Sequence, residues 1–340
     1  MKPKVYITRK IPESGIRLIA EFCDIVVHPG EEPPDEKEII RNVGDKDAIL
    51  CLLSDRINKN VINAAPVLKV ISTMSAGFEH IDVSEATNKG IYICYTPGIL
   101  TDATADLAFT LLLSVSRRIV EADRFVREMN WKIAWSPELF LGQSVCGSTI
   151  GIIGLGRIGK GMARRAQGFN MKVIYNNITG LLPDEEKELG IEYRSLDDLL
   201  GESDFVSLHV PLTKETYHII DENRLMSMKP GAILINTSRG SVIDEAALIR
   251  ALKENRIAGA GLDVFEKEPL DADNPLLKMD NVILLPHIGS ANTKTRGNMS
   301  EIAAENLLAV LKGQPPLYWL NPEAEKIKPL TEAKEVRVGR

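Results

Sequence analysis

The chain has 340 residues, of which 44% are hydrophobic and 26% charged, and its formal net charge is −6. This length suits two globular domains, and the composition is that of a soluble protein. The negative charge gives no general attraction to nucleic acids or anionic membranes, and the N-terminus "MKPKVYITRK" lacks the apolar stretch of a signal peptide. The apolar run "LAFTLLLSV" is too short to span a bilayer. We therefore expect neither nucleic acid nor membrane as a partner.

The four cysteines, Cys23, Cys51, Cys94 and Cys146, stand apart and form no C-x-x-C pair. This spacing predicts neither a zinc site nor a disulfide framework. We expect buried thiols in a reducing cytoplasm, and no bound metal.

Short apolar segments alternate with helical patterns through the first hundred residues. The predicted strands are "KVYIT" (4–8), "DIVVH" (24–28), "AILCLL" (48–53), "KVISTM" (69–74) and "IYICY" (91–95). The predicted helices between them are "SGIRLIAEF" (14–22), "DEKEIIRNV" (35–43) and "KNVINAA" (59–65). Strands that are apolar on both faces and separated by helices are typical of a parallel sheet covered on both sides.

A second series of the same kind follows. Its predicted strands are "TIGIIG" (149–154), "KVIYN" (172–176), "DFVSLHV" (204–210), "AILINTS" (232–238), "AGAGLDV" (258–264) and "VILLP" (282–286). Helical patterns at 160–169, 196–203 and 244–255 separate them. The sequence therefore predicts two α/β units, each a doubly wound parallel sheet.

Two long helical patterns flank the second series. The first covers residues 101–130 and begins with the capping candidates Thr101 and Asp102; the second covers residues 291–313. The first would carry the chain into the second unit, and the other would return it to the first. We expect a first domain of residues 1–100 and 289–322, a second domain of residues 101–288, and a charged, loosely attached tail of residues 323–340.

A glycine-rich turn lies between the predicted strand at 149–154 and the helix that follows it. Gly154, Gly156 and Gly159 form the pattern G-x-G-x-x-G. The first glycine permits a tight turn, the second a close approach of the backbone to a pyrophosphate, and the third close packing of helix on strand. The helix terminus then offers free N–H groups to phosphates, and Arg157 can add a cation. The pattern predicts a dinucleotide site.

The next strand ends in Asn176 and Asn177, where such sites commonly carry an acidic residue that binds the ribose hydroxyls. A neutral side chain there does not repel a 2′-phosphate. Asn176, Asn177 and Thr179 can all form hydrogen bonds, but the loop holds no arginine, and the nearest cations are Arg157, Arg164 and Arg165. We expect NADP(H) to be preferred and NAD(H) to be accepted as well.

Three polar residues follow later strands: Arg239 in "SRGSVID", Glu268 in "DVFEKEPL" and His287 in "LLPHIGS". Reduction of a keto acid needs a cation for the carboxylate and carbonyl, which a guanidinium supplies. It also needs a proton donor that works near neutrality, and imidazole has a reference pKa of about 6.5. A carboxylate beside the imidazole favours its protonated form.

These motifs resemble those of the D-2-hydroxyacid dehydrogenases, from about residue 3 to 320. The similarity rests on "GIIGLGRIG", "LINTSRGSVIDE", "AGAGLDVFEKEPL" and "LLPHIGSA". It implies a Rossmann cofactor domain inserted in a flavodoxin-like substrate domain, with a cleft between them that closes on the substrate. It implies that Arg239 clamps the substrate, that His287 is the acid/base and that Glu268 is its partner.

The resemblance also implies further binding residues. In "STMSAGFEHID" the backbone N–H groups of Ala76 and Gly77 would hold the substrate carboxylate, with Leu53 and Ser290 beside it. The other implied cofactor contacts are Thr104, Ile158, Ile178, Val210, Pro211, Thr237, Ser238, Asp263 and Gly289.

Within the family, "CLLSD", "KVISTMS" and "YTP" look most like the glyoxylate/hydroxypyruvate reductase branch. That branch often uses NADPH and carries a tryptophan that reaches into the partner subunit's site, a role open to Trp135. We expect a cytoplasmic homodimer that transfers a hydride from NAD(P)H to glyoxylate or hydroxypyruvate. The exposed apolar pattern of "FVREMNWKIAWSPELFLG" indicates the interface. Phosphoglycerate, phosphite or formate dehydrogenases remain alternatives, as does a dinucleotide-sensing corepressor or scaffold.

Overall fold

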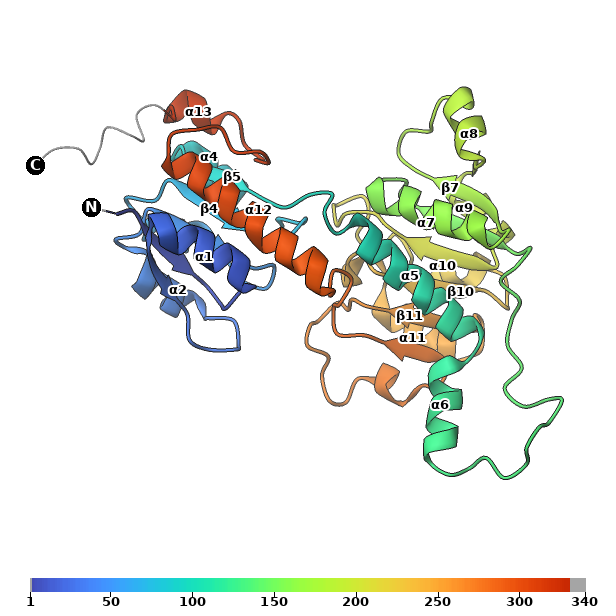
Figure 1. Cartoon of the computed structure of the whole chain (residues 1–340). Coiled ribbons are helices and arrows are strands. Elements are labelled where there is room, and N and C mark those ends of the chain that lie inside the picture. Colours follow the sequence, from blue (N-terminus) through green and yellow to red (C-terminus); the bar gives the residue numbers. More distant parts are fainter. Residues whose placement is uncertain (1, 331–340) are drawn as a thin grey trace, which may run out of the picture. The chain divides into compact units, whose positions relative to one another are not determined.

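A computed structural model describes residues 2–330 of the chain. It divides the chain into two compact units, residues Met1–Leu100 with Ala291–Arg340 and residues Thr101–Ser290 (Figure 1). The sequence had suggested residues 101–288 for the second of these units.

The first unit contains a parallel sheet of order β2-β1-β3-β4-β5. Its strands are β1 (Lys4–Ile7), β2 (Asp24–Val27), β3 (Ala48–Cys51), β4 (Val70–Thr73) and β5 (Tyr92–Cys94). Its helices are α1 (Glu13–Phe22), α2 (Glu36–Val43), α3 (Lys59–Asn63), α4 (Val83–Asn88), α12 (Thr293–Leu311) and α13 (Ala324–Ile327).

Alternate strand residues face opposite sides of this sheet. Val5, Ile7 and Leu50 pack with residues of α1 and α12, whereas Tyr6 and Ile49 pack with residues of α2, α3 and α4. Both faces are thus covered by helices, which explains why the strands read as continuous apolar runs.

The second unit contains a parallel sheet of order β12-β11-β10-β9-β6-β7-β8. Its strands are β6 (Thr149–Ile153), β7 (Lys172–Asn176), β8 (Glu192–Tyr193), β9 (Phe205–Leu208), β10 (Ile233–Asn236), β11 (Gly259–Leu262) and β12 (Val282–Leu284). Its helices are α5 (Thr101–Ser116), α6 (Ile119–Arg127), α7 (Arg157–Gly168), α8 (Pro183–Leu189), α9 (Leu196–Glu202), α10 (Glu222–Ser227) and α11 (Glu245–Lys253), with 3-10 turns η1 (Gly240–Val242) and η2 (Pro275–Lys278).

Helices α5 and α7 pack on one face of this second sheet, and α9, α10 and α11 pack on the other (Figure 1). The strand order reverses between β6 and β9, and the loops that follow two such strands form the usual ligand crevice of an open α/β sheet. The predicted fold class, two doubly wound parallel sheets, is confirmed.

Three local expectations need correction. The helical pattern at 101–130 forms two helices, because Arg118 adopts a left-handed conformation with φ of 54° and ends the first. Cys146 is exposed, whereas the other three cysteines are buried as expected. The segment from residue 323 is not loosely attached as far as Leu330, which is 6% exposed, and Tyr92 donates a hydrogen bond of 2.7 Å to the Lys328 carbonyl. The remainder of that segment lies outside the described residues.

No helix within residues 2–330 has the length and apolar character needed to cross a membrane.

Candidate active site

The glycine loop lies where the strand order of the second sheet reverses. Gly154 has φ of 94°, and a Cβ added to it would lie 2.7 Å from the carbonyl carbon of His209, at the end of β9. A Cβ on Gly159 would lie 2.1 Å from the Gly154 oxygen. These two glycines are therefore required by the packing of the loop itself.

Gly156 differs from these two glycines. A Cβ on it would meet no described atom within 4 Å, so packing does not explain the glycine. Gly156 is the N-cap of α7, and no side chain among the described residues caps this terminus. The first amides of α7 have no intrahelical acceptor and are open to an anion. This loop fits the pyrophosphate of a dinucleotide.

The end of β7 shows how the two asparagines differ. Asn176 Nδ2 donates 2.9 Å to the Arg194 carbonyl, so this side chain ties two strands together. Asn177 lies over the glycine loop, accepting from the Leu155 amide at 3.4 Å and donating to the Thr179 carbonyl at 3.1 Å. Ile178 is 95% exposed.

The cations near this strand end are not equally available. Arg165 pairs with Asp106 at 2.6 Å, and Arg164 lies 3.5 Å from Asp102. Arg157 is exposed at the first position of α7. Of the three arginines considered from the sequence, it is therefore the one best placed to meet an additional phosphate.

His287 and Glu268 come together at the carboxyl end of the sheet. His287 Nδ1 lies 2.8 Å from Glu268 Oε2, and Glu268 Oε1 accepts from the Phe265 amide at 3.0 Å. Burial raises the pKa of the Glu268 carboxyl. Its hydrogen bond to His287 and the nearby charges of His287 and Arg239 outweigh this effect, and the net pKa lies below its ordinary value. The carboxylate is thus held ionised against the imidazole.

Asp263 supports the turn that carries His287. Its two oxygens accept from the amides of Ile288 and Gly289, each at 2.7 Å, and its carbonyl accepts from the His287 amide at 3.0 Å. The turn places His287 at φ of 53°, a conformation that non-glycine residues rarely adopt and that often marks functional sites. Burial raises the pKa of the Asp263 carboxyl, against the lowering effect of the two amides and His287.

Arg239 lies in the short loop between β10 and η1, directly before Gly240. Asn236 Nδ2 donates 2.9 Å to the Arg239 carbonyl, and Asn236 Oδ1 accepts from the Ser238 amide at 3.0 Å. The next residue must be glycine, because a Cβ on Gly240 would lie 1.8 Å from the Phe265 carbonyl carbon. The loop after β10 is therefore fixed against the loop after β11, which carries Glu268.

The hydroxyl of Thr237 is a second feature that fits a bound dinucleotide. Its hydroxyl is buried and has no hydrogen-bond partner among the described residues. A buried hydroxyl without a partner is costly, so its presence beside Arg239 fits a ligand that supplies the missing bond. Thr104 and Gly289 also lie close to Asp263, since a Cβ on Gly289 would be 3.3 Å from Asp263 Oδ2 and 3.4 Å from Thr104 Oγ1.

The first unit places its candidates in loops after β3 and β4. Leu53 is 45% exposed, and Ala76 and Gly77 are half-buried. The amides of Ala76 and Gly77 find no acceptor within residues 2–330. They are free to bind an anion.

The remaining candidates are spread through the second unit. Val210 lies against the glycine loop, 2.8 Å from a Cβ placed on Gly154, whereas Pro211 is exposed. Ile158, Ser238 and Ser290 are half-buried. Trp135 is 76% exposed, and the described part of a single chain gives it no hydrogen bond or ring contact.

Asn236 and Ser75 were not predicted from the sequence. Asn236 fixes the Arg239 loop, and Ser75 Oγ donates 2.6 Å to the Gly77 carbonyl. Short polar side chains that precede a turn commonly bond to its backbone, and that pattern is the signal in "NTSRG" and "SAG".

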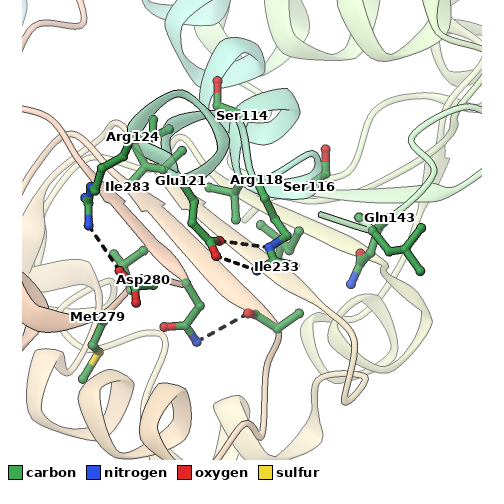
Figure 2. A pocket seen from close by; sticks show the side chains of 17 residues that line it. Ser114, Ser116, Arg118, Glu121, Arg124, Gln143, Ile233, Met279, Asp280 and Ile283 are labelled. Atoms are coloured by element: carbon green, nitrogen blue, oxygen red, sulfur yellow. Dashed lines mark hydrogen bonds and ion pairs between the residues drawn. The ribbon is translucent and has the colours of Figure 1, made fainter. Parts of the chain in front are cut away.

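A pocket of about 580 Å³ lies at the opposite ends of the strands in the second unit (Figure 2). Ile233 and Val282, at the starts of β10 and β12, line it with residues of α5 and α6. Ion pairs join Arg118 to Glu121 and Arg124 to Asp280 among the residues that line it. Because His287 and Arg239 follow the carboxyl ends of strands, this pocket is not the candidate active site.

Within residues 2–330, no three His, Cys, Asp or Glu side chains are grouped so as to hold a metal ion.

A seven-stranded sheet of this order, with an open glycine loop at its reversal point, defines a Rossmann-type dinucleotide-binding domain. Residues 109–289 match the family model described as "D-isomer specific 2-hydroxyacid dehydrogenase, NAD binding domain". The chain is 52% identical to a glyoxylate reductase of Thermofilum pendens, over 98% of this chain and 99% of the relative. It is 53% identical to a glyoxylate reductase of Korarchaeum cryptofilum, over 97% and 99%.

Solved structures give the same result. A protein from Thermus thermophilus superposes with a TM-score of 0.88 at 43% identity, covering 93% of this chain and 99% of that one. An NADPH-dependent glyoxylate/hydroxypyruvate reductase from Sinorhizobium meliloti, solved with NADP and malonate, gives a TM-score of 0.85 at 32% identity, covering 95% and 98%.

The chain therefore belongs to the D-isomer specific 2-hydroxyacid dehydrogenase family. It is an oxidoreductase that works with a nicotinamide dinucleotide, and the family resemblance predicted from its motifs is confirmed.

Proposed function

We propose that this protein reduces glyoxylate or hydroxypyruvate to the corresponding 2-hydroxy acid. The observation that carries the proposal is the His287–Glu268 pair, 2.8 Å apart, with the charge of Arg239 acting on the same carboxylate. The relatives named glyoxylate reductase, which match almost the whole chain, support this choice of substrate.

The residues divide the chemistry as follows. A bound nicotinamide dinucleotide supplies the hydride. Arg239 pairs with the substrate carboxylate and polarises the keto oxygen through its planar guanidinium. Glu268 is hydrogen-bonded to Nδ1 of His287, so the proton passes to the substrate oxygen from Nε2. Glu268 stays ionised and stabilises the imidazolium before the proton leaves.

The first unit contributes carboxylate binding. We assign this role to the amides of Ala76 and Gly77, with Leu53 and Ser290 lining the substrate. Support comes from the absence of any acceptor for these two amides among the described residues. Two backbone donors together recognise an anion without the cost of ordering a long side chain.

The cofactor is proposed to be NADPH in preference to NADH. The amides at the start of α7 hold the pyrophosphate, and the neutral Asn177 leaves the ribose 2′ position without a repelling charge. Arg157 supplies the exposed cation. Since this loop holds no arginine that could bind the 2′-phosphate through two hydrogen bonds, the preference for NADPH over NADH should be modest, about tenfold.

The protein is further proposed to be a homodimer. Large apolar side chains are exposed along α6 and the segment after it, among them Met129 at 73%, Ile133 at 68%, Trp135 at 76% and Leu141 at 66%. One of them, Leu141, also helps to line the pocket described above. Such a surface marks an interface, and a two-fold dimer would cover it and bring Trp135 to the partner's substrate. Light scattering at micromolar concentration should give twice the monomer mass, and a monomer would contradict the proposal.

We place the protein in the cytoplasm, because all four cysteines are free thiols. Fractionation of the source cells tests this directly.

Turnover with a panel of 2-keto acids tests the function. Glyoxylate and hydroxypyruvate should be reduced with the highest kcat/KM, each assayed with NADH and with NADPH. A protein that binds NADPH but reduces no 2-keto acid would instead be a sensor or scaffold, and preference for phosphohydroxypyruvate would place it among the phosphoglycerate enzymes.

A further inference from the structure

The loop that carries the two free amides is closed by one of its own side chains. Ser75 Oγ donates 2.6 Å to the carbonyl of Gly77. The ring formed by this bond contains the peptide units that bear the amides of Ala76 and Gly77. The orientation of both amides therefore depends on where the Ser75 hydroxyl is held.

The Ser75 hydroxyl is the last member of a chain of hydrogen bonds. Thr73 Oγ1 lies 2.7 Å from Ser75 Oγ and 3.0 Å from His80 Nε2. A carbonyl can only accept, so the single proton of Ser75 goes to Gly77. Ser75 must then accept from Thr73, and Thr73 must accept from His80. The chain thus runs in one direction and fixes the proton of His80 on Nε2.

Burial makes this chain sensitive to the loss of any member. Thr73 is 0% and Ser75 4% exposed, so water cannot readily replace a missing partner. Cys51 Sγ lies 3.9 Å from the same nitrogen of His80, but burial raises the pKa of the Cys51 thiol, which stays neutral and is only a weak partner. Of these two neighbours, Thr73 is therefore the stronger acceptor for Nε2 of His80.

The loop is also attached by backbone hydrogen bonds that do not involve the His80–Thr73–Ser75 hydrogen bonds. The Thr96 amide donates 2.9 Å to the Ser75 carbonyl, and the Met74 amide donates 3.0 Å to the Cys51 carbonyl. Removing a hydroxyl from the chain should therefore leave the loop attached and the unit folded. What is lost is the fixed orientation of the two amides.

We propose that His80, Thr73 and Ser75 are positioning residues that orient the Ala76 and Gly77 amides toward the substrate carboxylate. This inference rests on the proposed function, since it assigns those amides to the carboxylate of a 2-keto acid. None of the three side chains contacts the substrate in this account. His80 acts through Thr73, Thr73 acts through Ser75, and Ser75 fixes the orientation of the backbone at Ala76 and Gly77.

The variants that test this proposal follow from the direction of the hydrogen bonds, which run from His80 through Thr73 to Ser75. Thr73→Val and Ser75→Ala remove a hydroxyl, and His80→Leu removes the first donor. His80→Gln keeps an amide donor in the place of Nε2 and should restore function. Ser72→Ala is the matched control, because Ser72 is also buried on β4 and its Oγ donates 2.8 Å to the Ala303 carbonyl, away from the chain.

The expected result is a change in substrate binding alone. Thr73→Val, Ser75→Ala and His80→Leu should each raise KM for glyoxylate about tenfold, as expected for one misaligned hydrogen bond to a charged group. The kcat and the KM for NADPH should change less than about twofold. The double variant Thr73→Val/Ser75→Ala should be no worse than the single variants, because both break the same chain.

Calorimetric titration of the NADPH-loaded protein with oxalate separates this proposal from the proposed function. Oxalate has the carboxylate of glyoxylate but is not reduced, so the three variants should bind it about tenfold more weakly than wild type and Ser72→Ala. Wild type that binds oxalate but does not reduce glyoxylate would refute the proposed function and leave the loop assignment supported. Variants that match Ser72→Ala in oxalate affinity and glyoxylate KM, or a His80→Gln no better than His80→Leu, would overturn the positioning role.

Discussion

His287 Nδ1 and Glu268 Oε2 lie 2.8 Å apart, although the two residues belong to different loops at the carboxyl ends of β11 and β12. A second pair in the same unit, His218 and Glu266, has the same separation of 2.8 Å through Nε2. Only the first pair leaves Nε2 of its imidazole for a substrate. The second therefore supplies a matched control for every variant of the first.

Glu268→Gln should move the pH profile of reduction to lower pH. The wild-type carboxylate has a pKa below its ordinary value, so at neutral pH it carries a negative charge beside the imidazole. Without that negative charge opposite the imidazole, the alkaline limb of kcat/KM should shift to lower pH. Glu266→Gln should leave the limb in place. An unchanged profile in Glu268→Gln would show that the pair does not carry the proton.

Arg239→Lys should mainly raise KM for the 2-keto acid. A lysine keeps the charge but cannot reproduce the paired contact of a guanidinium with a carboxylate. Steady-state kinetics at saturating NADPH measure this, with Arg250→Lys as the control, because Arg250 pairs with Glu222 on the surface at 3.0 Å. A normal KM in Arg239→Lys would remove Arg239 from substrate binding.

Gly156 and Gly159 should respond differently to alanine. The added Cβ of Gly159→Ala would lie 2.1 Å from a backbone oxygen, so this variant should lose about 2 kcal/mol or more in chemical denaturation. Gly156→Ala should fold with a loss below about 1 kcal/mol, since its φ of −71° suits alanine and the new methyl group meets no described atom. Its KM for NADPH should nevertheless rise. Equal KM values for NADPH in Gly156→Ala and wild type would mean that the pyrophosphate does not approach this residue.

Asn177→Asp should reverse the cofactor preference. A carboxylate at this position repels the 2′-phosphate, so KM for NADPH should rise while NADH is retained or improved. Asn176→Asp is the comparison, because Asn176 bonds to the Arg194 carbonyl, and its change should affect stability more than cofactor choice. Wild type that prefers NADH by tenfold or more would contradict the account of this strand end.

The sequence was sufficient for the parts of the fold that repeat. Alternation of apolar strands with helices predicted two parallel sheets, and G-x-G-x-x-G predicted the tight glycine turn between β6 and α7. The order Arg239, Glu268, His287 after successive strands was also sufficient to place these residues at one edge of a sheet, because parallel strands share that edge.

Other features depend on contacts that a sequence pattern does not contain. The break at Arg118 interrupts an unbroken helical pattern, because a single left-handed residue turns the chain. Asn176 and Asn177 are adjacent and chemically identical, yet one bonds across strands and the other lies over the glycine loop. The burial of Leu330 arises from packing against the first unit, while its local sequence is charged. Ser75 is an ordinary loop residue until Thr73 and Gly77 are seen beside it.

We expect His287 to donate the proton in the reduction of glyoxylate. Oxidation of NADPH by glyoxylate, followed by absorbance with wild type, His287→Ala and His218→Ala, tests it most directly. Wild type and His218→Ala should turn over at similar rates, while His287→Ala should lose kcat by roughly 10²–10⁴-fold with NADPH binding intact. Wild type that does not oxidise NADPH with any 2-keto acid, or a His287→Ala variant as active as His218→Ala, would contradict the account.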